Sequence, residues 1–566
     1  MTRISPSQIA TLLLSLVAGC SAGEAPPEFD LQGFIDARIK SGERRIVVPP
    51  GKYRVAPKHG THLMFKNLAD IEVIADGVEM ICTNTCRVAV FENCKNVRLK
   101  GLIVDFDPLP FTEARIVALA PDKSWADFEI IEGYPENELQ QRIEIFDPVT
   151  RELRRETPGF QDQIEALGNH RYRATKPKSY RYREDWDTEQ VGDILVTNNC
   201  FPNGATGHAF SAERCTGLIL EDITLYAAST FGFVEHQCDG TTYRHCQINR
   251  RPPENDPVKR GFPRMRSLNA DAFHSTGATK GPAILGCTAK FQGDDCVNIH
   301  GTYHLVTGCE GPALRIAVLH KRLTIEPGDP IEFLPYSGVR PADAVAVKLE
   351  PDAPVTEAEL DFIRKLNLLP RHKDLLLGGE ATFYKLTLDR AVPLEMGSAV
   401  CSGRRCGNGF LVKDCDFGYN RSRAILIKAS RGGVIANHIT HGWMAAVLVA
   451  PEFWWFESSS SSDVEIRDNV IDGCRRPAIE IIAPGGNGKP LPSGAHRNIR
   501  ITGNKFGTSA WPNIQVTSTE HLVIQDNQLT PAEPKGFVPP LARPWAWNNT
   551  PPKAIVTELC DKAEIQ

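Results

Sequence analysis

The stretch Glu213-Arg-Cys-Thr-Gly-Leu-Ile-Leu-Glu-Asp-Ile-Thr-Leu-Tyr226 contains a turn followed by two short runs in which apolar and polar residues alternate. The same pattern recurs at 92–105, 237–248, 462–471, 496–506 and 519–529. Alternation with a period of two is typical of half-buried strands. Such short units cannot bury their apolar faces alone, whereas stacked coils can. The repeats therefore predict an all-β fold, a right-handed parallel β-helix.

Equivalent turn positions in these repeats carry Cys or Asn, which predicts ladders of like side chains inside the β-helix. The ladder positions are Cys246, Cys287, Cys415, Asn469, Asn504 and Asn527. A free cysteine behaves as a small buried apolar residue, so the ladders account for part of the 16 cysteines. Two close pairs, Cys82 with Cys86 and Cys401 with Cys406, are possible local disulfides.

The repeats also predict where the chain leaves the β-helix. Coils are expected at 28–105, 200–301 and 401–535, beginning with a short helix near Phe34 that leads to Val48-Pro-Pro-Gly-Lys-Tyr53. Segments 106–199 and 302–400 lack the repeat spacing and are expected to form two inserted small β-barrel-like domains. Within the second, Thr356–Leu368 has helical spacing. The tail, 536–566, either caps the last coil or is mobile.

The N-terminus has the features of a bacterial export signal. The apolar run from Ile9 to Ala18 is too short to span a bilayer and fits a signal peptide. Val17-Ala-Gly-Cys20 resembles a lipobox, which predicts a signal peptide over 1–20 and a lipidated Cys20. Ser21 favours the outer membrane, so we expect a protein of the cell envelope that meets a membrane only through this lipid anchor. Plain secretion is the alternative.

Composition limits the classes of function. The chain has 566 residues, 64 basic and 69 acidic, and a net charge of −5, with 42% hydrophobic and 23% charged residues. These fractions are ordinary for a globular protein and exclude collagen and wholly disordered chains. The slight acidity argues against a nucleic-acid partner, because phosphate binding needs clustered Lys and Arg.

Three aspartates in the centre of the chain are expected to meet. Asp271 precedes the pair Asp294 and Asp295 by about one coil, and residues one coil apart stack on the same face of adjacent strands. Carboxylates this close cannot all ionise freely, so at least one pKa should rise. Glycoside hydrolysis uses such a pairing of a protonated carboxyl group and an ionised one. A solvated turn or a calcium site is the alternative interpretation.

Further polar and aromatic residues are expected on the same face, where they would bind substrate. They are Glu235, His274, His300, Arg423, Lys428, Trp455 and Glu457. Each also has a structural interpretation: the histidines as stacked structural residues, the cations as neutralisers of the carboxylates, the tryptophan as core, and Glu457 as a surface acid.

The motif N-x-D-x-x-H followed by D-D-x-x-N-x-H-G-T-Y resembles glycoside hydrolase family 110, the α-1,3-galactosidases. Here it comprises Asn269, Asp271, His274, Asp294, Asp295, Asn298, His300, Gly301, Thr302 and Tyr303. The resemblance extends to Asp107–Phe111 and Trp455–Glu457, and it implies a β-helix with β-barrel insertions and an exo-acting, inverting hydrolase that removes terminal α-1,3-linked galactose.

The resemblance further implies that Asp271 is the general acid and that Asp294 and Asp295 hold and activate the water. Working carboxyl groups in inverting sites are roughly 6.5–9.5 Å apart. No metal or other cofactor is expected, and the expected partner is a glycan or polysaccharide fragment that contains an α-galactoside. The chain is also a candidate for a homo-oligomer associated through the insertions.

Three alternatives remain. A polygalacturonase-like pectin hydrolase shares N-x-D and G-D-D, but it would place its histidine much farther after the aspartate pair and would have a compact R-x-K. A pectate-lyase-like enzyme would use calcium. A non-catalytic, surface-anchored glycan-binding β-helix fits the lipid anchor and the tryptophans, but it does not need three clustered carboxylates.

Overall fold

The computed structural model describes residues 27–136, 139–154, 163–177, 188–199, 207–319, 322–353, 356–366, 368–508, 512–530 and 553–566. The expected signal peptide and Cys20 lie outside these ranges, as does most of the tail. Among the described helices, none has the length and apolar character required to cross a bilayer.

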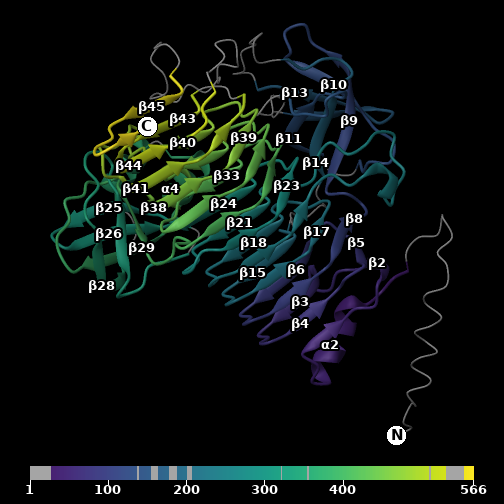
Figure 1. Ribbon diagram of the computed structural model, residues 1–566, viewed down its shortest axis with the longest axis horizontal. Coiled ribbons are helices and arrows are strands. Elements are labelled where there is room, and N and C mark those ends of the chain that lie inside the picture. The colour runs from purple at the N-terminus through teal and green to yellow at the C-terminus, as the bar shows by residue number, and fades with distance from the viewer. Residues whose placement is uncertain are drawn as a thin grey trace.

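The chain winds into a parallel β-helix in which each coil contributes strands to long parallel sheets, stacked along one axis (Figure 1). The first sheet consists, in spatial order, of β1 (Arg45–Val47), β4 (Glu72–Ile74), β7 (Arg98–Lys100), β16 (Ile219–Glu221), β19 (Thr242–Arg244), β22 (Ala283–Leu285), β31 (Leu411–Lys413), β34 (Gly432–Ile435), β38 (Ser462–Arg467), β41 (His496–Thr502), β44 (Thr519–Gln525) and β46 (Glu564–Ile565).

The second sheet carries the candidate site and is called the site sheet. Its parallel strands are β3 (Thr61–Lys66), β6 (Arg87–Glu92), β15 (Phe210–Glu213), β18 (Phe233–His236), β21 (Phe273–Thr276), β24 (Val297–Thr302), β33 (Ile425–Ile427), β36 (Val447–Val449), β40 (Ile479–Ile481), β43 (Ile514–Thr517) and β45 (Ile555–Glu558). Short β37 (Glu457–Ser458) pairs antiparallel with the end of β24.

The third sheet closes each coil. Its strands are β2 (Gly51–Val55), β5 (Val78–Cys82), β8 (Ile103–Phe106), β17 (Thr224–Leu225), β20 (Gln247–Ile248), β23 (Thr288–Lys290), β32 (Asp416–Gly418), β35 (His438–Thr440), β39 (Val470–Asp472) and β42 (Lys505–Phe506). Helix α2 (Leu31–Lys40) precedes the first coil. At the other end β45 and β46 continue two of the sheets, so the described part of the tail extends the β-helix.

The buried faces of the β-helix strands build a continuous core along the coils. Phe210, Phe233 and Phe273 stack in successive coils, with ring centroids 4.9 and 5.2 Å apart. The predicted polar ladder is present: the backbone N–H groups of Asn469 and Asn504 each donate to the side-chain oxygen of the next asparagine, at 3.1 and 3.0 Å. The side-chain amides of these asparagines also donate to buried backbone carbonyl oxygens, which would be costly to bury without a hydrogen-bond partner.

The two possible local disulfides are not formed, because all four thiols are free and buried. The Cys86 sulfur lies 3.7 Å from His62 Nδ1, and the Cys406 thiol donates to the Ser402 carbonyl oxygen at 3.2 Å. These cysteines therefore pack as small interior side chains, as the ladder cysteines do.

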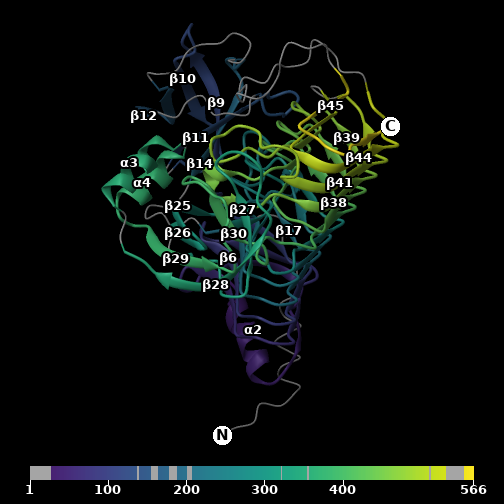
Figure 2. The ribbon, with the colours of Figure 1, turned by 90° about the vertical axis from the view of Figure 1, so that its left-hand side faces the viewer.

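Both insertions project from the same flank of the β-helix (Figure 2). The first is a six-stranded antiparallel sheet in the order β11 (Leu139–Phe146), β14 (Ile194–Asn199), β9 (Phe111–Leu119), β10 (Trp125–Ile130), β13 (Arg171–Thr175) and β12 (Gln163–Gly168). The second is a closed barrel in the order β25 (His304–Glu310), β26 (Ala313–Val318), β29 (Thr382–Leu388), β28 (Ala344–Pro351), β27 (Pro330–Leu334) and β30 (Ala399–Ser402).

Two helices cover part of the barrel. Helix α3 (Glu357–Lys365) begins after Thr356, which forms a reciprocal capping box with Glu359, and it confirms the helix predicted from the spacing. Helix α4 (Pro370–Leu377) follows directly and was not predicted. Two single-turn 3₁₀ helices, η1 (Pro253–Asn255) and η3 (Phe453–Trp455), complete the described helices.

Candidate active site

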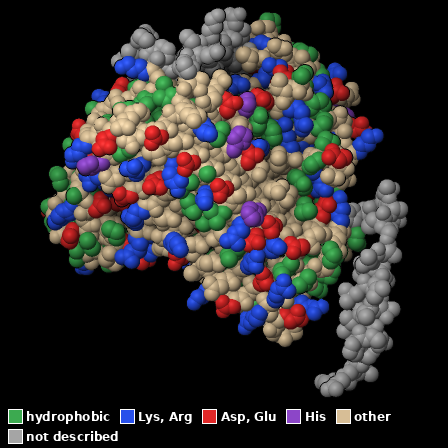
Figure 3. Space-filling view, viewed as in Figure 1, with side chains coloured by type: hydrophobic (Ala, Val, Ile, Leu, Met, Phe, Trp, Pro, Cys, Tyr) green, Lys and Arg blue, Asp and Glu red, His purple; other side chains and the backbone are tan. Residues whose placement is uncertain are grey.

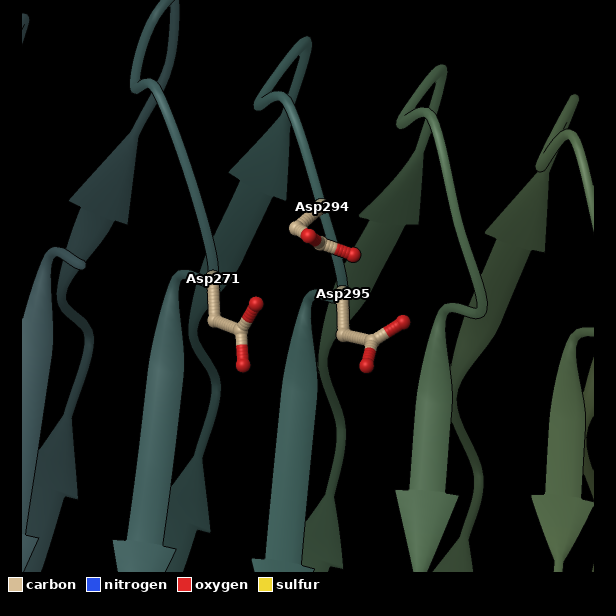
Figure 4. Close-up of side chains that lie close together, drawn as sticks. All are labelled: Asp271, Asp294 and Asp295. Atoms are coloured by element: carbon tan, nitrogen blue, oxygen red, sulfur yellow. The ribbon is translucent and has the colours of Figure 1, made fainter. Parts of the chain in front are cut away.

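The three aspartates lie where the chain enters two neighbouring strands of the site sheet (Figure 4). Asp271 precedes β21, whereas Asp294 and Asp295 precede β24, and the backbone N–H of Ala272 donates to the carbonyl oxygen of Asp295 at 2.9 Å. One side-chain oxygen from each aspartate lies within 4.8 Å of the other two. The one-coil spacing therefore brings them together as predicted, with nearest oxygens closer than the separation expected between inverting carboxyl groups.

Two arginines from the following coil hold the aspartate pair. Arg421 Nη2 lies 2.7 Å from Asp294 Oδ2, and Arg423 Nη2 lies 3.0 Å from Asp295 Oδ2. Burial raises the pKa of Asp295 well above its usual range, and Asp271 and Asp294 add to the rise against the opposing charge of Arg423. The cluster therefore favours retention of a proton, as acid catalysis requires.

The opposite wall is a buried ion network around Lys428. Its ammonium lies 3.1 Å from Glu452 Oε2 and 2.7 Å from Glu457 Oε2, and it donates to Asn298 Oδ1 at 3.1 Å. Burial raises the pKa of Glu457, whereas His300 in its protonated form and Lys428 lower it, and the overall shift is downward. At neutral pH, where His300 is neutral, Lys428 is the cation that favours the ionised form of Glu457. Glu457 is therefore an ionised hydrogen-bond acceptor in the lining of the cavity.

Two histidines connect the aspartates to this wall. His274 Nδ1 lies 2.8 Å from Asp271 Oδ2, and its ring stacks on Phe231 with centroids 4.5 Å apart. His300 Nε2 lies 3.0 Å from His274 Nε2. Burial lowers the pKa of both histidines to about 4, so both rings are neutral at neutral pH.

A half-exposed tryptophan forms the rim. Trp455, 40% exposed, ends η3, and the guanidinium carbon of Arg371 from α4 lies 4.5 Å from its ring centroid. His372 Nδ1 contacts the carbonyl oxygen of Trp454 at 3.0 Å, which ties α4 to the rim. Aromatic faces of this kind are suited to the apolar faces of sugar rings.

These groups enclose a cavity of about 260 Å³. It is lined by Phe231, Asp271, His274, Asp294, Asp295, Asn298, Arg421, Ser422, Arg423, Met444, Glu452, Trp455 and Glu457. Seven of the predicted site residues are in this lining. His300 and Lys428 are not: they lie behind it and hold lining residues in place.

The prediction that Glu235 belongs to the site is wrong. Val234 pairs in register with His274, which faces the cavity, so the next residue on β18 faces the core. Glu235 is completely buried and accepts a hydrogen bond from Ser275 Oγ at 2.5 Å. Burial raises its pKa, so the interior favours the neutral acid.

Sequence reasoning missed several groups that the structure places at or behind the cavity. Glu452 and Arg421 stand close in sequence to Glu457 and Arg423, and those short spacings were the available signal. Glu144 had no local signal, because it comes from β11 of the first insertion. Its Oε2 accepts from Arg266 Nη2 at 2.7 Å, and its Oε1 lies 3.4 Å from Arg421 Nε.

The aspartate oxygens are close enough together to bridge a cation. The charges of Arg421 and Arg423 already compensate Asp294 and Asp295, and an acidic cluster alone does not define a metal site. We therefore assign no metal or other cofactor to these residues.

No family model matches the chain. Alpha-1,3-galactosidase A of Bacteroides fragilis is 21% identical over 558 residues, covering 89% of this chain and 84% of the relative. Alpha-1,3-galactosidase B of Bacteroides thetaiotaomicron is 22% identical over 560 residues, covering 88% and 82%.

Solved structures are more distant. A Family 28 exopolygalacturonase of Yersinia enterocolitica aligns with 94% of this chain and 74% of its own, with a TM-score of 0.40 and 9% identity. A mannuronan C-5 epimerase A-module of Azotobacter vinelandii aligns over 95% and 94%, with a TM-score of 0.34 and 11% identity. The chain is thus similar over most of its length to proteins named alpha-1,3-galactosidase, and this similarity, on a parallel β-helix, supports a glycoside hydrolase.

Proposed function

We propose that the protein is an exo-acting, inverting glycoside hydrolase that removes terminal α-1,3-linked galactose from glycans or polysaccharide fragments. The observation that carries the proposal is the meeting of Asp271, Asp294 and Asp295 in a small walled cavity. The named relatives support the choice of sugar and linkage. A cavity of about 260 Å³ that ends against a buried ion network suits a terminal residue better than the middle of a chain.

In the proposed mechanism Asp271 gives a proton to the leaving oxygen, while Asp294 and Asp295 hold and deprotonate the attacking water. Arg421 and Arg423 favour the ionised forms of the second pair, which suits a base. Asp295 is the competing candidate for the acid, because its burial raises its pKa. Inversion rests on the family resemblance.

Nuclear magnetic resonance of the first released sugar tests the reaction. The full chain would be given α-1,3-galactosides, other α-galactosides and galacturonides. We expect β-galactose as the first product of the α-1,3-linked substrate. α-Galactose would refute inversion, galacturonate would identify a pectin hydrolase, and binding without release from any substrate would identify a glycan-binding protein.

A substrate with a better leaving group distinguishes the two candidates for the general acid, Asp271 and Asp295. An activated aryl α-galactoside needs little protonation, so it should restore turnover to the variant that lacks the acid. We expect this substrate to rescue Asp271→Asn and not Asp294→Asn or Asp295→Asn. Rescue of Asp295→Asn alone would transfer the role of acid to Asp295.

We further propose that the protein is anchored in the cell envelope through lipid on Cys20. The support is the lipobox-like Val17-Ala-Gly-Cys20 after a short apolar run. Metabolic labelling with a palmitate analogue should mark the wild-type chain and not Cys20→Ala. Labelling of both chains, or of neither, would refute the anchor.

On the face shown in Figure 3, basic and acidic side chains are interspersed rather than separated by sign.

A further inference from the structure

The chain of contacts that runs from Asp271 through His274 and His300 to the Gly301 carbonyl has a defined direction. A carbonyl oxygen only accepts hydrogen bonds, and His300 Nδ1 lies 2.6 Å from the oxygen of Gly301. His300 Nδ1 therefore carries a hydrogen. Because a neutral imidazole has one N–H, His300 Nε2 is left as an acceptor.

Two groups approach that acceptor. Thr276 Oγ1 and His274 Nε2 each lie 3.0 Å from His300 Nε2. A hydroxyl rotates to donate, but the imidazole nitrogen makes a favourable contact only if it carries a hydrogen. The second contact therefore places the hydrogen of His274 on Nε2, and the Nδ1 of a neutral His274 is then an acceptor as well.

His274 Nδ1 faces Asp271 Oδ2 at 2.8 Å, so one hydrogen must lie between them. With His274 neutral, that hydrogen belongs to the carboxyl group of Asp271. We propose that His300 is a positioning residue which, through the tautomer of His274, keeps the Asp271 carboxyl group protonated in the resting enzyme. This inference rests on the proposed function insofar as Asp271 is the acid.

The chain of contacts from Asp271 through His274 to His300, called the relay, is surrounded by charges from three neighbouring segments, and each segment carries charges of one sign. Burial lowers the pKa of the nearby His208 to about 4 and of His236 to about 3, so these rings add no charge at neutral pH. The charged groups facing the relay are Asp294 and Asp295 before β24, Arg423 and Lys428 around β33, and Glu452 and Glu457 around β37.

The proton balance of a turnover follows from this arrangement. Asp271 gives its proton to the leaving oxygen as the glycosidic bond breaks and becomes a carboxylate. The attacking water loses a proton to the Asp294 and Asp295 pair as the new carbon–oxygen bond forms. Transfer of that proton across the cluster, whose nearest oxygens lie within 4.8 Å, restores the carboxyl group beside His274.

Replacing His300 by phenylalanine removes the acceptor and keeps the size of the ring. His274 is then free to carry its hydrogen on Nδ1 and donate to an Asp271 carboxylate, which favours loss of the acid proton. We expect His300→Phe to move the alkaline limb of the kcat/KM profile about one pH unit downward, with kcat reduced and KM nearly unchanged. His300→Gln, whose amide oxygen accepts a hydrogen bond, should restore the wild-type limb.

Thr276→Val is the matched control, because it removes the other donor to His300 Nε2 and leaves the contact with His274. Its alkaline limb should stay in place. An unshifted limb in His300→Phe, or an equal shift in Thr276→Val, overturns the proposal.

Nitrogen-15 NMR of histidine-labelled full-length protein separates the relay from the function. The signals of His274 and His300 are assigned from their own variants. In the wild type, His274 should carry hydrogen on Nε2 at neutral pH, and in His300→Phe on Nδ1. A wild-type His274 that carries hydrogen on Nδ1 overturns the relay. If the NMR spectra show the expected tautomers but the protein turns over no galactoside, the inference about His300 and His274 stands and the proposed function is refuted.

Discussion

Replacing Lys428 by methionine tests the buried ion network most directly. The Lys428 side chain is fully buried, and its ammonium holds both Glu452 and Glu457. Methionine is similar in volume, so the main effect is to leave the buried Glu452 and the partly buried Glu457 without their shared cation. Removing one partner of a buried ion pair costs about 3–5 kcal/mol, and we expect Lys428→Met to lower the free energy of unfolding by that amount at neutral pH.

A matched control is available on the surface. Lys348 Nζ lies 2.7 Å from Glu350 Oε1, the same distance as in the Lys428–Glu457 pair, but its side chain is 62% exposed. Exposed pairs contribute about 0–1 kcal/mol, so Lys348→Met should have a small effect. Urea unfolding of both variants and the wild type, followed by circular dichroism, measures the difference.

The pH dependence sharpens this test. His274 and His300 are neutral at neutral pH, so without Lys428 burial is left to raise the pKa of Glu457 above the unfolded value of about 4.3. A carboxyl group with a raised folded-state pKa contributes stability below its unfolded pKa and loses it as the pH rises. The deficit of Lys428→Met should therefore be larger at about pH 7.5 than at about pH 4.5. A deficit no larger than that of Lys348→Met, or one independent of pH, would refute the reasoning.

Three further predictions concern other buried groups. Glu144→Gln should reduce kcat by about 10- to 100-fold, because Arg421 is held between Glu144 and the aspartate pair; unchanged steady-state kinetics would contradict this. Burial lowers the pKa of His304 and His496 to about 4. Because a histidine with a lowered folded-state pKa loses its contribution to stability as the pH falls, the protein should lose stability between about pH 6.5 and about pH 4. A constant melting temperature over that range would contradict this prediction. Glu235→Gln should keep full activity, and loss of turnover would return Glu235 to the site. As the pH rises, the melting temperature of Glu235→Gln should increase relative to that of the wild type, because the wild-type interior favours the neutral acid.

Sequence alone predicts the β-helix because its stabilising contacts repeat from coil to coil. The ladder asparagines occupy the same turn in each repeat, so their spacing reveals which residues stack. The strand order within the insertions is not accessible in this way, since antiparallel partners such as β9 and β14 are far apart in the chain and have no repeat to align them.

The same reasoning explains the outcomes at the site. The spacing between Asp271 and Asp294 is one coil, so their meeting was predictable. Glu235 was misplaced because assignment to a coil does not decide which of two faces a residue occupies, and a shift of one position reverses the face. Glu144 reaches the site from a separate inserted sheet, a long-range contact that no local pattern signals.

The barrel enters and leaves the β-helix through neighbouring strands, since His304 of β25 pairs with Val400 of β30. Two chain ends that are already adjacent can be joined at little entropic cost. The barrel is therefore a module whose sequence can be lengthened, shortened or exchanged without disrupting the coil into which it is inserted. Through α4 this module supports the tryptophan rim, whereas the aspartates belong to the coils. Under the proposed function, recognition of the outer part of a substrate can therefore diversify while the proposed catalytic aspartates stay unchanged.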